Sequence, residues 1–139
     1  MRNSPKPPKP RSPLARWTPS IYKLPALSVR QPWAWLICAG FKDIENRSRR
    51  THYRGPLLIH AGLKVADVGR HITELHGLKL PAELETGGIV GIVDVVDCVE
   101  EHPSPWFAGT GYGWVLANPR RLRFRECKGA LGLFRPNMT

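Results

Sequence analysis

Short hydrophobic runs alternate with polar stretches rich in glycine and proline along most of the chain. Runs rich in β-branched side chains and bounded by turn residues are typical of strands that become buried. The longest of them, residues 89–99, contains Gly91, which predicts a β-bulge or a tight bend. The pattern predicts strands over residues 42–48, 56–61, 89–99, 114–117 and 121–125, the last two separated by a turn at Asn118-Pro119. The apolar residues of segment 129–134 are expected to pack again in the core.

Two segments have the spacing of helices. Pro32 suits the first position of a helix and Gly40 suits its C-terminal cap, so a short helix is expected between them. Residues 64–78 carry apolar side chains at helical spacing, which predicts an amphipathic surface helix. Strands and helices do not alternate as a parallel sheet requires. We therefore predict an α+β fold that is mainly β, a small bent β-barrel of about six strands with helices packed at its ends.

The composition divides the chain into two parts. At 139 residues it has the length of one domain, and 42% hydrophobic residues suffice for one core. Residues 1–25 hold six Lys or Arg, no Asp or Glu, and seven of the fourteen prolines. Such a segment predicts a disordered Pro-rich basic tail that either contacts phosphates or is simply solvated, and it leaves residues 26–139 as the folded domain.

Charge and the absence of several motifs limit the function classes. The net charge of +10 indicates a polyanionic partner. No apolar run is long enough to span a membrane and no signal peptide is recognisable, so we expect a cytoplasmic protein. The three cysteines form no CxxC pair and the five histidines form no HxH or HxxxH pair, so neither a metal site nor a cofactor is predicted.

Charged side chains are concentrated in residues 42–54, between runs hydrophobic enough to be buried. Buried polar groups need partners, so this cluster forms either a paired network or a ligand pocket. Lys42, Glu45 and Arg47 can form a structural ion-pair network, anchor a ligand, or act as acid and base. The ligand-binding residues that we expect are Arg30, Gln31, Trp33, Lys42, Glu45, Arg47, Arg49, Arg50, Thr51, Tyr53, Arg54, Tyr112 and Lys128.

Aromatic residues offer surfaces on which bases could stack. Trp33 and Trp35 lie two positions apart on the expected helix and point to different faces, so either one lines a cleft or both pack at the end of the barrel. Residues 100–113 predict a long surface loop anchored by Trp106, Phe107 and Tyr112, of the kind that often lines a site. His60 is either a hydrogen-bonded core residue or reaches the floor of the cleft.

Several motifs together resemble one known family. They are SVRQPWA at residues 28–34, GFKDIENR at 40–47, YRG at 53–55, LIHA at 58–61, YGWV at 112–115 and KGALGL at 128–133. This series resembles the ASCH domain, named for homology to activating signal cointegrator 1, over essentially everything after the tail. The resemblance implies a relationship to PUA domains, and hence a pseudo-barrel with a cleft beside the first helix and a role in RNA metabolism.

The functions that this resemblance implies are varied, because one fold can carry several chemistries. The family includes RNA-binding modules, a coactivator domain that binds nucleic acid, a ribonuclease activity and amidohydrolases that deacetylate N4-acetylcytidine. In the amidohydrolases a G-x-K motif supplies a catalytic lysine, to which Lys42 corresponds, and a threonine three residues later is the nucleophile. Glu45 takes that position here, which removes the hydroxyl nucleophile but leaves a carboxylate that can activate water.

We therefore predict a module that binds RNA, another single-stranded nucleic acid or a nucleotide-like ligand in a basic cleft beside the first helix. A hydrolase acting on RNA or modified nucleosides, with Lys42 and Glu45 as its catalytic pair, is the alternative. The third hypothesis is that the same surface binds an acidic protein partner.

Overall fold

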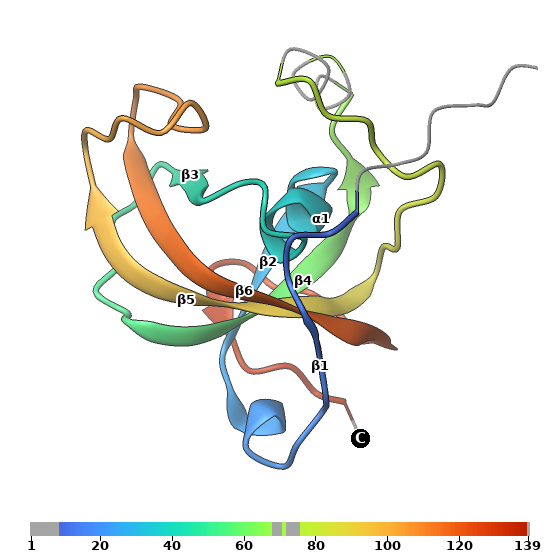
Figure 1. Ribbon diagram of the computed structural model, residues 1–139. Helices are drawn as coiled ribbons and strands as arrows, with labels where there is room; N and C mark the ends of the chain where they lie inside the picture. The colour runs from blue at the N-terminus through green and yellow to red at the C-terminus, as the bar shows by residue number, and fades with distance from the viewer. Residues whose placement is uncertain (1–8, 68–70, 72–75, 139) are drawn as a thin grey trace, which may run out of the picture.

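The computed structural model describes residues 9–67, 71 and 76–138 (Figure 1). Most of them lie in one mixed sheet of seven strands, with neighbours in the order β1-β6-β5-β4-β2-β7 and with β3 paired to β6. A helix α1 (Trp33–Cys38) and a 3-10 turn η1 (Ile21–Lys23) complete the described elements. The strands are β1 (Leu14–Ala15), β2 (Ala26–Gln31), β3 (Ile44–Arg47), β4 (Gly55–Val65), β5 (Gly88–Val99), β6 (Tyr112–Glu126) and β7 (Leu133–Phe134).

The sheet curves around α1 but does not close (Figure 1). Strands β4, β5 and β6 form an antiparallel series, and β2 joins β4 in parallel. At one edge of the sheet the short strands β1 and β3 pair with different parts of β6. At the other edge β7 pairs with β2. A barrel requires its two edges to pair. The mainly β fold is confirmed. Within the described residues no ladder joins the two edges, so the sheet is not closed as the predicted small bent β-barrel would be.

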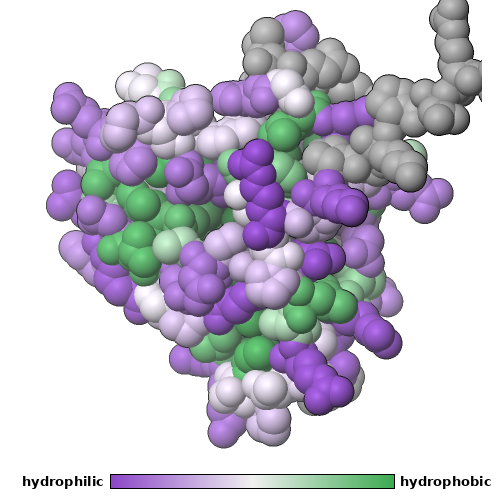
Figure 2. All heavy atoms as spheres, viewed as in Figure 1, coloured by the Kyte–Doolittle hydropathy of each residue, from purple (hydrophilic) through white to green (hydrophobic). Residues whose placement is uncertain are grey.

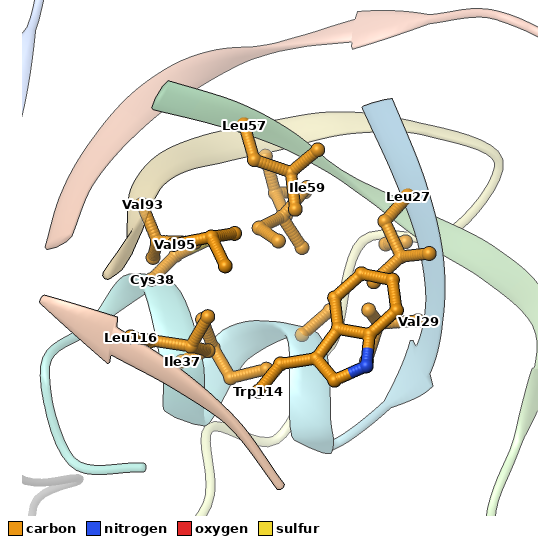
Figure 3. Packing of buried hydrophobic residues seen from close by; sticks show 13 residues of the cluster. Leu27, Val29, Ile37, Cys38, Leu57, Ile59, Val93, Val95, Trp114 and Leu116 are labelled. Atoms are coloured by element: carbon orange, nitrogen blue, oxygen red, sulfur yellow. The ribbon is translucent and has the colours of Figure 1, made fainter. Parts of the chain in front are cut away.

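The hydrophobic core lies between α1 and the sheet. Ala34, Ile37 and Cys38 have the i, i+3, i+4 spacing of one helix face and belong to this core cluster, and Leu36 is buried as well. Figure 3 shows Ile37 and Cys38 of α1 on the same side of the cluster as Val93 and Val95 of β5, with Leu27 and Val29 of β2 across from them. A second cluster, which includes Leu58, Ile92 and Leu122, is covered partly by Trp17 and Phe134. Core packing therefore fixes α1 against β2, β4, β5 and β6.

The predicted turn at Asn118-Pro119 is a bulge within one strand. Strand β6 runs through both residues, and the register places them together opposite Val93 alone. Asn118 has a positive φ of 50°, a conformation that asparagine tolerates better than most residues. An extra residue in one strand bends that strand without ending it. The irregularity predicted at Gly91 is confirmed by the register shifts beside it.

Two other predicted segments differ from the structure. Lys64 and Val65, expected to begin a helix, are the last residues of β4, and the rest of that predicted helix falls mostly on residues 68–70 and 72–75, outside the described part. Residues 129–134 return less to the core than expected. Leu131 is 99% exposed and Leu133 is 39% exposed. Of the two residues of β7, Leu133 and Phe134, Phe134 is the one that packs against a core cluster.

Residues 9–25 pack on the sheet, so the prediction of a disordered tail is wrong for this part, and residues 1–8 lie outside the described residues. Strand β1 pairs in parallel with β6. The Ser12 hydroxyl donates to the carbonyl of Cys38, and the Trp17 indole N–H donates to the carbonyl of Arg123 at 2.8 Å. Disorder was predicted from the high proline content. A few apolar and hydrogen-bonding residues among the prolines are nevertheless enough to hold the segment against the sheet.

We expect Trp17→Ala to lower the free energy of unfolding by about 2–3 kcal/mol, less than for a fully buried tryptophan because Trp17 is half-buried. The substitution removes the indole hydrogen bond and its packing on the second core cluster. Urea titration measures the effect. The control is Leu131→Ala, an exposed site where a change within about 0.5 kcal/mol is expected. Equal stability of the two variants would contradict the docking of the segment.

Candidate functional site

A pocket of about 810 Å³ opens beside α1, between β3, the ends of β2 and β4, and the loop before β6. The fold brings these elements together because β3 pairs with the start of β6 while α1 follows β2 directly. Its apolar lining comes mainly from Val29, Trp33, Leu63, Trp106, Phe107 and Leu131. Its charged lining comes from Arg30, Lys42, Glu45, Arg47 and Lys64.

The charged floor is one connected network. Glu45 and Arg47 lie two apart on β3 and so share a face of the strand, while Lys42 approaches from the preceding turn. Lys42 Nζ donates to the Ile44 carbonyl and lies 3.4 Å from Glu45 Oε1. Arg47 Nε donates to Glu45 Oε2 at 2.9 Å, and its Nη2 donates to the Ser28 carbonyl at 2.6 Å. One carboxylate therefore serves two cations.

Burial makes Lys42 the most perturbed group of this network. The side chain is 5% exposed, and desolvation lowers its pKa below the ordinary value. The carboxylate of Glu45 opposes this effect by its charge and its hydrogen bond. The charge of Asp43 acts in the same direction as that of Glu45, but desolvation is the larger effect, so Lys42 loses its proton more readily than a surface lysine does.

The lowered pKa predicts a pH dependence of stability. Between that pKa and the ordinary value of 10.5, the unfolded chain binds a proton at Lys42 that the folded chain has lost. The free energy of unfolding contributed by this group therefore rises with pH across that interval. Lys42→Met removes the rise, and urea titrations of both proteins at a series of pH values measure the difference. Parallel pH profiles for the two proteins would contradict the lowered pKa.

The two tryptophans of α1 have different surroundings. Trp33 lines the pocket, with Lys42 Nζ 5.9 Å from its ring centroid. Trp35 instead stacks on Phe41, with the ring centroids 5.6 Å apart, and does not line this pocket. Of the two possibilities left open by their spacing, the structure has one indole in the pocket and one outside it.

The loop before β6 supplies the opposite aromatic wall. The Asn46 amide donates to the Trp106 carbonyl at 3.0 Å and accepts from the Ala108 N–H at 2.9 Å, so β3 holds this loop in place. The His76 ring stacks on Trp106 with centroids 3.9 Å apart. Trp106, Phe107 and His76 all line the pocket. Two of the three predicted aromatic residues of this loop, Trp106 and Phe107, therefore face the pocket, while the third, Tyr112, begins β6 outside it.

The structure brings together only some of the expected binding residues. Arg30, Trp33, Lys42, Glu45 and Arg47 line the pocket, and eight others do not. Several of these eight hold the backbone instead. Among the contacts they make, Gln31 donates to the Glu85 carbonyl at 2.8 Å, and the Tyr53 hydroxyl donates to the Pro56 carbonyl. The residues outside the pocket are Gln31, Arg49, Arg50, Thr51, Tyr53, Arg54, Tyr112 and Lys128.

His60 is a hydrogen-bonded core residue, and it does not line the pocket. Its Nε2 lies 2.8 Å from the Cys127 carbonyl, which can only accept, so the proton is on Nε2. Its Nδ1 then accepts from the Ser28 hydroxyl at 3.0 Å. Both ring nitrogens are satisfied within the fold.

A family model for the ASCH domain matches residues 27–125. The chain belongs to the ASCH family. Activating signal cointegrator 1 from Homo sapiens is 36% identical over 83 residues, which cover 54% of this chain and 14% of that protein. The protein of the same name from Mus musculus is 35% identical over the same lengths. The chain thus matches about a seventh of these curated relatives. The matched family segment contains every charged residue of the pocket floor and begins after the docked N-terminal segment.

Two further findings apply to residues 9–67, 71 and 76–138. No helix there is both long and apolar enough to cross a membrane. In the same part of the chain, no group of three or more His, Cys, Asp or Glu side chains is placed to hold a metal ion.

Proposed function

We propose that this ASCH domain binds single-stranded RNA by taking one nucleotide into the pocket beside α1. The observation that carries the proposal is the pairing of aromatic walls with a charged floor in one cavity of about 810 Å³. Aromatic faces stack on any base, and a small number of fixed polar groups orients a ligand in an otherwise apolar cavity.

The two ends of the pocket support different contacts with such a nucleotide. Trp33 and Trp106 would provide the surfaces on which a base stacks, and Lys42 lies in the charged floor, where it would contact the edge of that base. Arg30 and Lys64 are exposed at the ends of β2 and β4 and would meet the phosphate. The ASCH family, through its relationship to PUA domains, is generally linked to RNA, which favours this ligand class over other aromatic anions.

The proposal is tested with fluorescence anisotropy and a labelled single-stranded RNA of about 16 nucleotides, the upper end of known single-strand site sizes. Unlabelled nucleoside monophosphates compete for the pocket. We expect competition by the monophosphates, and weaker binding by a Lys42→Ala variant that stays folded with only a small loss of stability. An acidic polypeptide that displaces the RNA at equal charge, while monophosphates do not, would contradict the proposal and favour an acidic protein partner.

Hydrolysis is the second candidate, and the lowered pKa of Lys42 is the observation that favours it. A lysine that loses its proton readily can act as a general base or nucleophile, and Glu45 lies beside it. Purified protein is incubated with labelled RNA and with N4-acetylcytidine, and a Lys42→Ala protein purified identically reveals contaminating nuclease. Turnover that is lost in this variant while RNA affinity is kept would establish the hydrolase and overturn a binding-only function.

A further inference from the structure

A second hollow, of about 560 Å³, lies where the N-terminal segment packs on β6. It is lined by Leu14, Ala15, Arg16, Trp17 and Arg123, none of which lines the pocket beside α1. The pairing of β1 with β6 builds it, because Leu14 and Ala15 lie opposite Arg121 and Leu122. The hydrogen bond from the Trp17 indole to the Arg123 carbonyl holds the aromatic ring between the two chain segments.

The charge around this hollow has one sign. The first acidic residue of the chain is Asp43, and no Asp or Glu occurs between Glu101 and Glu126. Each of the two segments that form the hollow therefore contributes arginines and has no Asp or Glu close to them in the sequence. Figure 2 shows, on the face that carries β1, hydrophobic areas bordered by hydrophilic residues. Arg125 adds a further cation, 4.9 Å from the Tyr22 ring centroid.

The arginines of this region divide into two groups by their contacts. Arg120 is paired with Asp94 at 2.6 Å, and Arg121 donates to the Ser12 carbonyl, so both are engaged in the fold. Arg16 and Arg123 are exposed, and neither side chain makes a hydrogen bond or an ion pair within the described part of the chain. Arg16, Arg123 and Trp17 thus line one hollow, and the donors of these two guanidinium groups are not used by the described part of the chain.

We propose that Arg16 and Arg123 form a second contact site for the phosphodiester backbone of single-stranded RNA, with Trp17 beneath an adjacent base or sugar. Guanidinium groups bind phosphate through paired donors, and single-stranded nucleic acids are typically held by cations that alternate with aromatic surfaces. The inference rests on the proposed RNA binding and extends it to a surface outside the pocket. An acidic protein segment would satisfy the cations but not the aromatic ring.

The test compares two double substitutions that remove the same charge. Arg16→Gln with Arg123→Gln changes the hollow, and Arg49→Gln with Arg50→Gln changes the exposed loop before β4. Kd for the RNA of about 16 nucleotides is measured by anisotropy over a range of salt concentrations. Because each phosphate neutralised on a single strand contributes about 0.7 to the slope of log K against log salt, the first pair should flatten the slope by about 1.4.

The control pair should leave the slope unchanged, and competition by nucleoside monophosphates should be the same in both double variants. Equal flattening by the two pairs would overturn the proposal, because it would reveal only a net-charge effect. Displacement of the RNA by polyglutamate at equal charge from wild-type protein, but not from the Arg16→Gln, Arg123→Gln protein, would overturn it in favour of an acidic protein partner.

A pocket substitution separates this inference from the proposed function. Trp33→Ala should weaken RNA binding and monophosphate competition while the salt slope retains the part that Arg16 and Arg123 supply. If RNA binding and its slope are unaffected by Trp33→Ala but flattened by the Arg16→Gln, Arg123→Gln pair, the second surface stands and the pocket proposal fails. If the Arg16→Gln, Arg123→Gln protein keeps the wild-type slope while Trp33→Ala loses affinity, the pocket stands and the second surface fails.

Discussion

Glu45→Gln should lower the free energy of unfolding by about 3 kcal/mol, a large effect for a single atom replaced. The Glu45 side chain is 10% exposed, and its carboxylate pairs with Lys42 at 3.4 Å and Arg47 at 2.9 Å. Its neutralisation leaves two cations facing each other in a largely buried network, and breaking a buried pair from one side typically costs about 3–5 kcal/mol. Urea titration at neutral pH measures the loss.

The reverse substitution has a different expected cost. Lys42→Met leaves Glu45 paired with Arg47, so the loss should be about 1 kcal/mol or less. In the double variant, Lys42→Met should recover much of the loss caused by Glu45→Gln, because the cation that needed the carboxylate is gone. Additive effects of the two substitutions would show that these side chains do not interact, and would contradict the network.

Trp33→Ala should weaken binding of single-stranded RNA by about 5- to 150-fold, the equivalent of the 1–3 kcal/mol that stacking of one base contributes. Trp33 is the one helix residue whose aromatic ring lines the pocket, beside the ammonium of Lys42. Anisotropy with labelled RNA measures the affinity, and circular dichroism verifies that the variant is folded.

Trp35→Ala is the matched control, since it removes the same side chain from the same helix. Trp35 stacks on Phe41 away from the pocket, so RNA affinity should stay within about twofold while stability falls. Equal losses of affinity in the two variants would contradict a specific role for Trp33 and indicate a general dependence on the helix.

The strands predicted most accurately are those whose sequence pattern is local and complete. Residues 56–61 and 89–99 are predominantly apolar, and they form most of β4 and β5. Strand β2 was not predicted, and its pairing with β4 and β7 comes from distant parts of the chain. Whether the sheet closes depends on how its two edges are occupied, and strand-by-strand patterns contain no information about that.

The candidate site was predicted in part for a similar reason. Lys42, Glu45 and Arg47 are close in sequence, and the alternation of a strand suffices to place two of them on one face. The neighbouring charged residues Arg49 and Arg50 seemed equally good candidates, yet the chain turns away from the pocket after β3. His76 and Leu63 were missed, since only tertiary folding brings them beside Trp106 and Trp33; aromatic Trp106 and Phe107 were the signal that identified the opposite wall.

The central claim, that RNA enters the pocket beside α1, is tested most directly by the indole N–H signals of the five tryptophans in a ¹H–¹⁵N correlation spectrum. Each is assigned by substitution and followed during titration with single-stranded RNA. We predict that Trp33 and Trp106, on opposite walls of the pocket, shift strongly, while Trp35 and the buried Trp114 change little. Saturation with RNA that leaves both Trp33 and Trp106 unshifted would contradict the account.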